Sequence, residues 1–135
     1  MTGSQAELLE ECRRAEKEQA LFYRRLASDA EARDAVDLAA RFHDLHADEQ
    51  HHLSRLTARL LELGGSPADL RDVPVPAGDL AGWEVLARAR EQDEVDWYEQ
   101  MLEAPLDSAT RCVIVEILDS ERHHHAELRG KWMSA

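Results

Sequence analysis

The chain has 135 residues, of which 44% are hydrophobic and 33% are charged, and acidic residues outnumber Lys and Arg by 28 to 16. This length suffices for a buried core, and we expect a single domain over residues 1–135. A nucleic-acid surface needs clustered basic residues, so the net charge of −12 argues against a nucleic-acid partner. The few aromatic residues and four prolines are typical of a helical protein.

The N-terminus reads MTGSQAELLEECRRAEKEQ, which lacks the basic start and unbroken apolar run of a signal peptide. No window approaches the roughly 18 apolar residues of a membrane span. We therefore expect a soluble, cytoplasmic protein without membrane association.

The two cysteines, Cys12 and Cys112, form no Cys-x-x-Cys pair, which excludes a zinc ribbon or a rubredoxin-type iron site. Both fall on helical apolar stripes. The pattern predicts that each is a small buried side chain rather than a disulfide partner.

The first half of the chain predicts two long helices joined by a short turn. Apolar positions at steps of three and four predict a first helix that ends near residue 30, and the polar segment SDAEARD is expected to be the turn. A second helix is expected from about Asp34 to Leu63, where a Gly-Gly pair stops it.

The second half begins with a long connection, Gly64 to Gly82, which holds three of the four prolines and four of the six glycines. A third helix is expected to begin between Asp79 and Trp83 and to break at Pro105.

A fourth helix is expected to start at Asp107 or Ser108 and to close between Gly130 and Ala135. The second helix would be about 45 Å long at ~1.5 Å per residue, and the connection could span it if extended. Helices two and three would then be parallel. One such long crossover is typical of the ferritin-like four-helix bundle.

Two short motifs recur along the chain. A Glu followed seven residues later by Tyr occurs at Glu16 and Glu91, and a Glu-x-x-His motif occurs at Glu49 and Glu121. The offsets between the copies are 75 and 72 residues, so the chain reads as two copies of one helical hairpin.

The repeated motifs place carboxylates and imidazoles where an apolar stripe calls for leucine. Burying an ionised carboxylate costs several kcal/mol unless it is paired or bound to a cation. Two divalent metal ions would neutralise four inward carboxylates, and this oxygen and nitrogen donor set suits iron or manganese. The predicted ligands are Glu16, Glu49, His52, Glu91, Glu121 and His124. The alternative is a polar-cored helical bundle without metal.

The chain resembles the ferritin-like superfamily over essentially its whole length. EKEQALFYRRLA and EQDEVDWYEQML resemble the first and third helices of rubrerythrin-like proteins, and VIVEILDSERHHHAEL resembles the last ligand helix of bacterioferritin. The resemblance implies that Glu16 and Glu91 are terminal carboxylates, that Glu49 and Glu121 bridge two iron ions, and that both motif histidines are terminal imidazoles.

Departures from these families limit which cofactor, domains and assembly we expect for this chain. Gln50 stands where haem-binding bacterioferritins place an axial Met, so no haem is expected. No rubredoxin domain follows, so a complete rubrerythrin electron chain is not expected. The chain ends soon after the fourth helix, without the fifth helix of cage-forming ferritins, so a 24-subunit shell is not expected either. Hemerythrin, the other four-helix di-iron protein, needs histidines on its first helix. No histidine precedes His43 in this chain, so we reject the hemerythrin interpretation.

Further polar residues flank the predicted ligands. Tyr23 and Tyr98 could contact the carboxylates, but a core tyrosine is the preferred interpretation. Glu94 resembles an extra third-helix carboxylate of rubrerythrins, although a solvated glutamate is preferred. A surface position is preferred for His46, and the middle histidine of HHH, His124, is the one expected to face inward.

The resemblance implies a di-iron carboxylate protein that reacts with O2 or H2O2, with ferroxidase or peroxidase activity in iron and oxidative-stress handling. Iron storage without turnover, or an oxygenase with an organic substrate, are the alternatives. Manganese or a mixed metal pair stays open, the electron donor is unknown, and a homodimer or higher homo-oligomer is expected.

Overall fold

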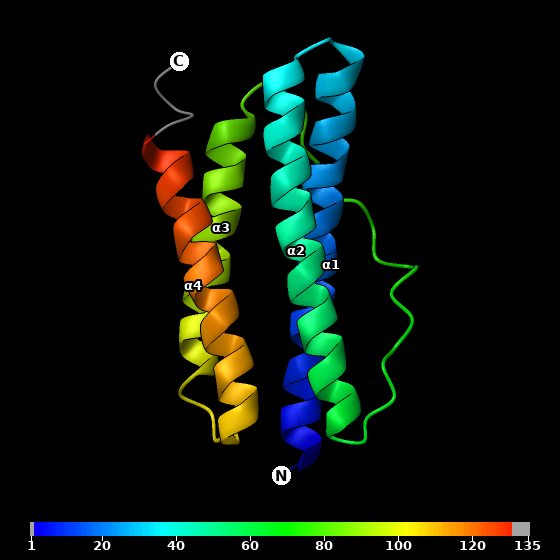
Figure 1. Ribbon diagram of the computed structural model, residues 1–135, viewed down its shortest axis with the longest axis vertical. Coiled ribbons are helices and arrows are strands. Elements are labelled where there is room, and N and C mark those ends of the chain that lie inside the picture. Colours follow the sequence, from blue (N-terminus) through cyan, green and yellow to red (C-terminus); the bar gives the residue numbers. More distant parts are fainter. Residues whose placement is uncertain (1, 131–135) are drawn as a thin grey trace. The chain divides into compact units, whose positions relative to one another are not determined.

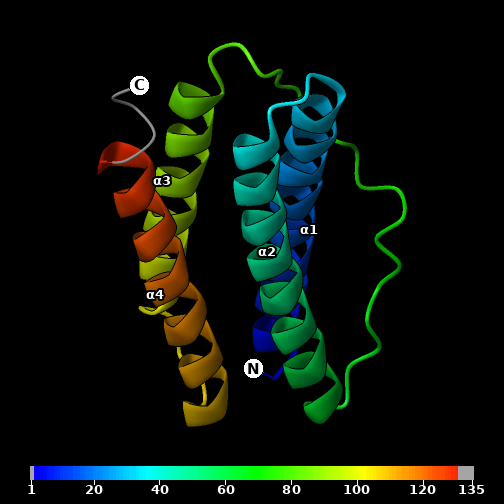
Figure 2. The ribbon, with the colours of Figure 1, turned by 45° about the horizontal axis from the view of Figure 1, so that its top comes forward.

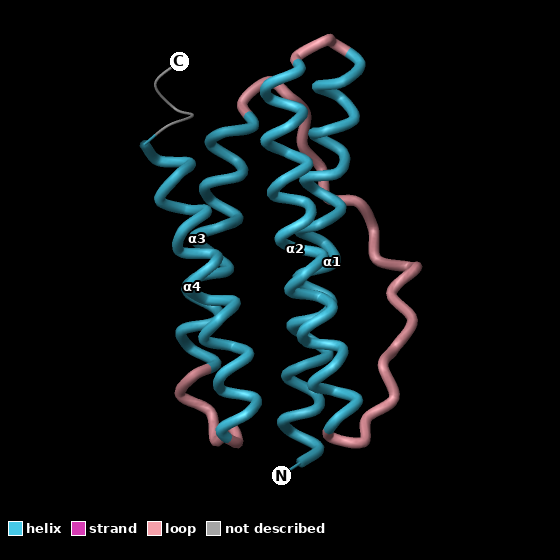
Figure 3. Tube along the Cα trace, viewed as in Figure 1, coloured by secondary structure: helices cyan, strands magenta, loops and turns pink. Residues whose placement is uncertain are grey.

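The computed structural model describes residues 2–130, which form four helices and no strand (Figures 1 and 3). The helices are α1 (Thr2–Ala32), α2 (Val36–Glu62), α3 (Trp83–Met101) and α4 (Ser108–Gly130). The all-α class and the order of the elements are as the sequence predicts.

The chain divides into two compact units, residues 1–80 and residues 81–135. Each unit is a helical hairpin, in which α1 lies beside α2 and α3 lies beside α4 (Figures 1 and 2). The predicted single-domain organisation stays a prediction.

The first hairpin packs along the apolar stripes of its two helices. Large side chains that are at most 2% exposed come from both helices: Leu9, Phe22, Tyr23 and Leu26 from α1, and Phe42, Leu45, Leu56 and Leu60 from α2. Residues three and four apart share one helix face, so each stripe is buried as one strip.

The turn between α1 and α2 is shorter than predicted, because α1 continues through the expected turn to Ala32. This segment has no Gly or Pro to stop the helix, and Ala30 is completely buried. The chain leaves the helical conformation just after Ala32, at Asp34, which has a φ of 57°. The N–H groups of Asp34 and Ala35 donate to the carbonyls of Glu31 (3.1 Å) and Ala30 (2.9 Å), which is a Schellman motif.

The end of α2 uses the same motif with the residue that favours it. Gly64 has a φ of 83°, and its N–H donates to the carbonyl of Leu61 at 2.9 Å. The N–H of Gly65 donates to the carbonyl of Leu60 at 3.0 Å. The predicted stop at the Gly-Gly pair is confirmed.

The long connection runs along the first hairpin and is fastened to α1 (Figure 1). The N–H of Ala68 donates to Glu10 Oε2 at 2.8 Å, and Arg13 donates to the carbonyl of Ala68 at 3.2 Å. Arg13 also donates to Thr57 Oγ1 of α2 at 2.9 Å, and Val73 of the connection is buried. One buried arginine therefore joins α1, α2 and the connection.

The second hairpin begins and ends its helices close to the predicted residues. Asp107 caps α4, since its Oδ1 accepts the N–H of Thr110 at 2.8 Å. Pro105 lies in the break between α3 and α4, as predicted. The helix α4 reaches Gly130, and the remainder of its predicted end lies outside the described residues.

The prediction for the cysteines is half wrong. Cys12 is completely buried, but Cys112 is exposed, and neither of these two described cysteines forms a disulfide. The buried residues of α4 include Val113, Ile114 and Ile117, so the face that packs excludes Cys112. In the described part of the chain, no helix is long and apolar enough to cross a membrane.

Candidate metal centre

The first hairpin brings three of the predicted ligands together. Glu16 comes from α1, Glu49 and His52 come from α2, and their ligand atoms all lie within 4.8 Å of one another. The Nδ1–H of His52 donates to Glu16 Oε1 at 2.9 Å and lies 3.3 Å from Glu49 Oε1. Both carboxylates are 0% exposed and the imidazole is 5% exposed.

The helical repeat of α2 explains this placement. Glu49 and His52 continue the buried stripe between Leu45 and Leu56, so the side chains point to the face that packs on α1. His51, one residue earlier, is exposed. The spacing thus selects His52 over its neighbour.

The second hairpin contains the same donor set. The ligand atoms of Glu91 from α3 and of Glu121 and His124 from α4 lie within 4.8 Å of one another. His124 Nδ1–H donates to Glu121 Oε1 at 3.0 Å and lies 3.7 Å from Glu91 Oε1. Both carboxylates are 0% exposed, and the imidazole is 1% exposed. We refer to each set of three residues as a half-site.

The half-sites have the composition of a metal site. Each offers carboxylate oxygens and one imidazole nitrogen, which are donors for iron, manganese or zinc. A carboxylate that water does not reach is costly unless a proton or cation compensates its charge, and each half-site holds two such groups against one imidazole. These buried groups could bind a metal ion.

The run HHH at residues 123–125 resolves as the spacing predicts. His123 is exposed, His124 is buried and His125 is half-exposed. Three consecutive residues span most of a helix turn, so only one of them faces the packed side.

Tyr23 and Tyr98 are both completely buried and so lie in the core, and a role of either at the carboxylates stays a prediction. Each has an aromatic neighbour at the preceding position. The ring centroids of Phe22 and Tyr23 are 5.2 Å apart, and those of Trp97 and Tyr98 are 5.3 Å apart.

The preferred interpretation of Glu94 as a solvated residue is wrong, because this side chain is only 9% exposed. Glu94 lies one turn after Glu91 and therefore shares its buried face. The repeat carried a signal for this: at the offset of 75 residues the counterpart of Glu94 is Gln19, which is 0% exposed. The second hairpin thus carries a buried carboxylate where the first has a neutral amide.

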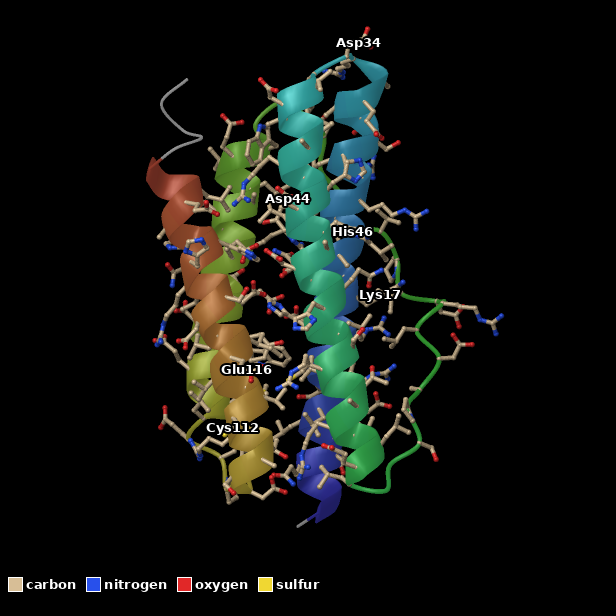
Figure 4. All side chains as sticks on the ribbon, viewed as in Figure 1. Lys17, Asp34, Asp44, His46, Cys112 and Glu116 are labelled. Atoms are coloured by element: carbon tan, nitrogen blue, oxygen red, sulfur yellow. The ribbon has the colours of Figure 1, made fainter. Side chains whose placement is uncertain are left out.

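His46 is not a simple surface residue. It is half-buried, and its Nδ1–H donates to the carbonyl of Ala20 at 3.1 Å. Burial lowers the pKa of His46 below 6.5, and the nearby positive groups of His43, Arg24 and Lys17 lower it further. Figure 4 shows Lys17 and His46 on the same side of the first hairpin.

No protein-family model and no curated protein matches the sequence. The structure is similar to a solved one, the bacterioferritin-related protein from Bacteroides fragilis, described as a dodecameric thioferritin in the bacterial domain. The TM-score is 0.81 at 20% sequence identity, and the match covers 96% of this chain and 84% of that chain.

The fold is ferritin-like.

This similarity confirms the predicted class, a ferritin-like four-helix bundle with a long connection between its second and third helices. At this level of sequence identity the ferritin-like fold alone is shown.

Proposed function

We propose that the two half-sites together form one dinuclear metal centre, with iron as its preferred metal, that reacts with O2 or H2O2. The observation that carries this proposal is the duplicated set of buried donors. Each of the two hairpins carries two fully buried glutamates and one buried histidine, whose ligand atoms lie within 4.8 Å of one another. Such a set is costly in a metal-free protein and is useful to a metal protein.

The chain's own residues have distinct roles in this proposal. Glu49 and Glu121 would be shared by the two ions, Glu16 and Glu91 would each hold one ion, and each histidine would contribute a ring nitrogen. In the described structure the Nδ1–H groups of His52 and His124 donate to carboxylates. A ring nitrogen can bind a metal only when it carries no hydrogen, so binding through Nδ1 would require the neutral ring to carry its hydrogen on Nε2 instead.

The bound ions would supply electrons, two at a time, to O2 or H2O2. The buried glutamates then keep the positive charge of the centre compensated, and the packed hairpins limit the access of water. A ferroxidase draws the electrons from Fe(II) as its substrate. A peroxidase draws them from a separate donor.

Iron storage is a second candidate, since the similar structure is described as a dodecameric thioferritin. We propose that this chain also forms a homo-oligomer. Storage predicts a large assembly that holds many more than two iron ions per chain. A dimer that holds two ions per chain would exclude storage by this protein alone.

The test is the rate of Fe(II) oxidation by O2 and by H2O2, followed by absorbance. Glu49→Gln removes a ligand charge with little change in shape, and we expect it to slow oxidation at least about tenfold. Glu62→Gln is the matched control, because it makes the same change at an exposed residue of α2. Equal rates for the wild type and Glu49→Gln would contradict the proposal.

A further inference from the structure

A hollow of about 390 Å³ lies on the first hairpin, between α1 and the long connection. It lies apart from the half-site residues of this hairpin, none of which line it. Its lining residues are Leu21, Arg24, Arg25, Ser28, Asp29 and Val75.

The helix geometry gives the hollow a defined shape. Leu21, Arg24, Arg25 and Ser28 stand at i, i+3, i+4 and i+7, so they are neighbours on the helix surface. The two arginines stand on either side of the line from Leu21 to Ser28. Val75, which is 49% exposed, contributes from the connection.

The long connection, which forms one wall of this hollow, is held in place by contacts with the first hairpin. The hydrogen bonds of Glu10 and Arg13 hold Ala68 against α1, and Val73, two residues before Val75, is buried. Both walls of the hollow are therefore fastened to the same hairpin.

The hollow is positively charged, whereas the chain as a whole is acidic. In a protein of net charge −12, neither Arg24 nor Arg25 has a carboxylate within ion-pair distance among the residues that the structure describes. Elsewhere in the described part of the chain arginines do pair with carboxylates, as Arg13, Arg14, Arg59, Arg71 and Arg122 do. Asp29 is the one acidic lining residue, so the formal charge of the hollow is 2 − 1 = +1.

A further basic residue of α1, Lys17, lies near Arg24 on the side of the helix that faces His46. Lys17 and Arg24 both act on His46 of α2 as positive neighbours, and they contribute to its lowered pKa. An anion that approaches this side of the hairpin would therefore be attracted before it reaches the guanidinium groups.

We propose that this hollow binds a small oxyanion ligand, a hydroxy-carboxylate or a phosphate ester. Guanidinium groups bind carboxylate and phosphate oxygens through paired N–H donors, and two of them suit a dianion. Ser28 adds a hydroxyl donor. Asp29 can accept a hydrogen bond from a ligand hydroxyl, while Leu21 and Val75 offer apolar contacts to a short carbon chain. The volume lies within the range of about 300–1,000 Å³ that small-ligand sites occupy.

The test is a titration of the full-length protein at constant ionic strength with malate, succinate and inorganic phosphate, followed by NMR and calorimetry. We expect saturable binding of malate or phosphate, with shifts of the backbone amides of Ser28 and Val75. Arg24→Gln and Arg25→Gln should each weaken binding at least about tenfold, because each removes a charge-assisted hydrogen bond.

Arg14→Gln is the matched control, because it removes the same charge from an exposed position on the same helix, where Arg14 pairs with Glu18. It should leave affinity unchanged. Equal weakening by all three substitutions would show unspecific attraction and would overturn the proposal. The absence of saturable binding, or shifts confined to other residues, would overturn it as well.

The ligand arms distinguish the two sources of the oxyanion. Malate differs from succinate by one hydroxyl, so a preference for malate that Asp29→Asn abolishes assigns the site to hydroxy-carboxylates. Tighter binding of phosphate, strengthened by Asp29→Asn, assigns it to phosphate esters. The proposal does not rest on the metal centre, and binding should persist in Glu49→Gln.

Discussion

His46 links the two helices of the first hairpin by one hydrogen bond to a backbone carbonyl, and its surroundings favour the neutral ring. Its pKa lies below the unfolded value of 6.5, because of burial and the positive groups around it. As the pH falls below that value, the unfolded chain takes up a proton that the folded chain resists. The contribution of His46 to stability is therefore complete above pH 6.5 and is lost as the pH falls through the folded pKa.

His46→Gln should for this reason make the stability less sensitive to acid. We expect the loss in urea midpoint between about pH 7.5 and about pH 5.5 to be smaller in the variant than in the wild type. His51→Gln, an exposed residue of the same helix, serves as the control and should behave like the wild type. An identical loss in all three proteins would refute this role of His46.

Sequence reasoning succeeded for single residues where a helical stripe decided the outcome. Glu49 and His52 interrupt a leucine stripe at positions that must be buried, and both are buried. The same reasoning failed for Cys112, because the buried stripe of α4 runs through Thr110, Ile114 and Ile117, and Cys112 lies off this stripe. It failed for Glu94 because the cost of burying a carboxylate argues for exposure, and sequence alone does not show what compensates it.

At the scale of the helices, α1 and α2 end in the same motif with different residues at its left-handed position. Asp34 has a φ of 57° and Gly64 a φ of 83°. A side chain costs energy in this conformation, whereas glycine adopts it freely. Asp34 therefore occupies the left-handed position of the C-terminal motif with strain, whereas Gly64 occupies the same position without strain.

Substitutions at these two positions should change the free energy of unfolding in opposite directions. Asp34→Gly should stabilise the protein, and Gly64→Ala should destabilise it, each by about 1 kcal/mol. A methyl group at Gly64 meets no atom within 4 Å, so the cost there is conformational rather than steric. Urea unfolding measures both, and a stabilising Gly64→Ala would contradict the assignment.

The helix boundaries show why turns are harder to predict than helices. The end of α2 was predicted from the Gly-Gly pair, and Asp107 was recognised at the start of α4. The segment SDAEARD was predicted as a turn from its polarity, yet most of it is helical. Polar residues with good helix propensity do not end a helix, and only a residue that leaves the helical region does so.

At the scale of the whole molecule, the central question is whether the two half-sites act as one. Ligands that bind only the folded state stabilise it, by about 2.7 kcal/mol at one hundred times the dissociation constant. If one centre needs both half-sites, a substitution that disables either half-site should remove most of the stabilisation that the bound metal gives.

Thermal unfolding with and without Mn(II) tests this dependence. We expect Mn(II) to raise the Tm of the wild type, and Glu49→Gln and Glu121→Gln each to abolish most of that rise. The double variant should then lose little more than either single variant. Additive losses would instead indicate two independent sites and would contradict the shared centre.

The two thiols offer experimental access to α1 and α4. Cys112 is open to solvent, whereas Cys12 is sealed within the first hairpin. A maleimide dye or spin label will attach to α4 in the native protein, because Cys112 alone presents its sulfur to the reagent. The wild-type chain is thus ready for single-site spectroscopy, and the moment at which Cys12 becomes reactive marks the opening of the first hairpin.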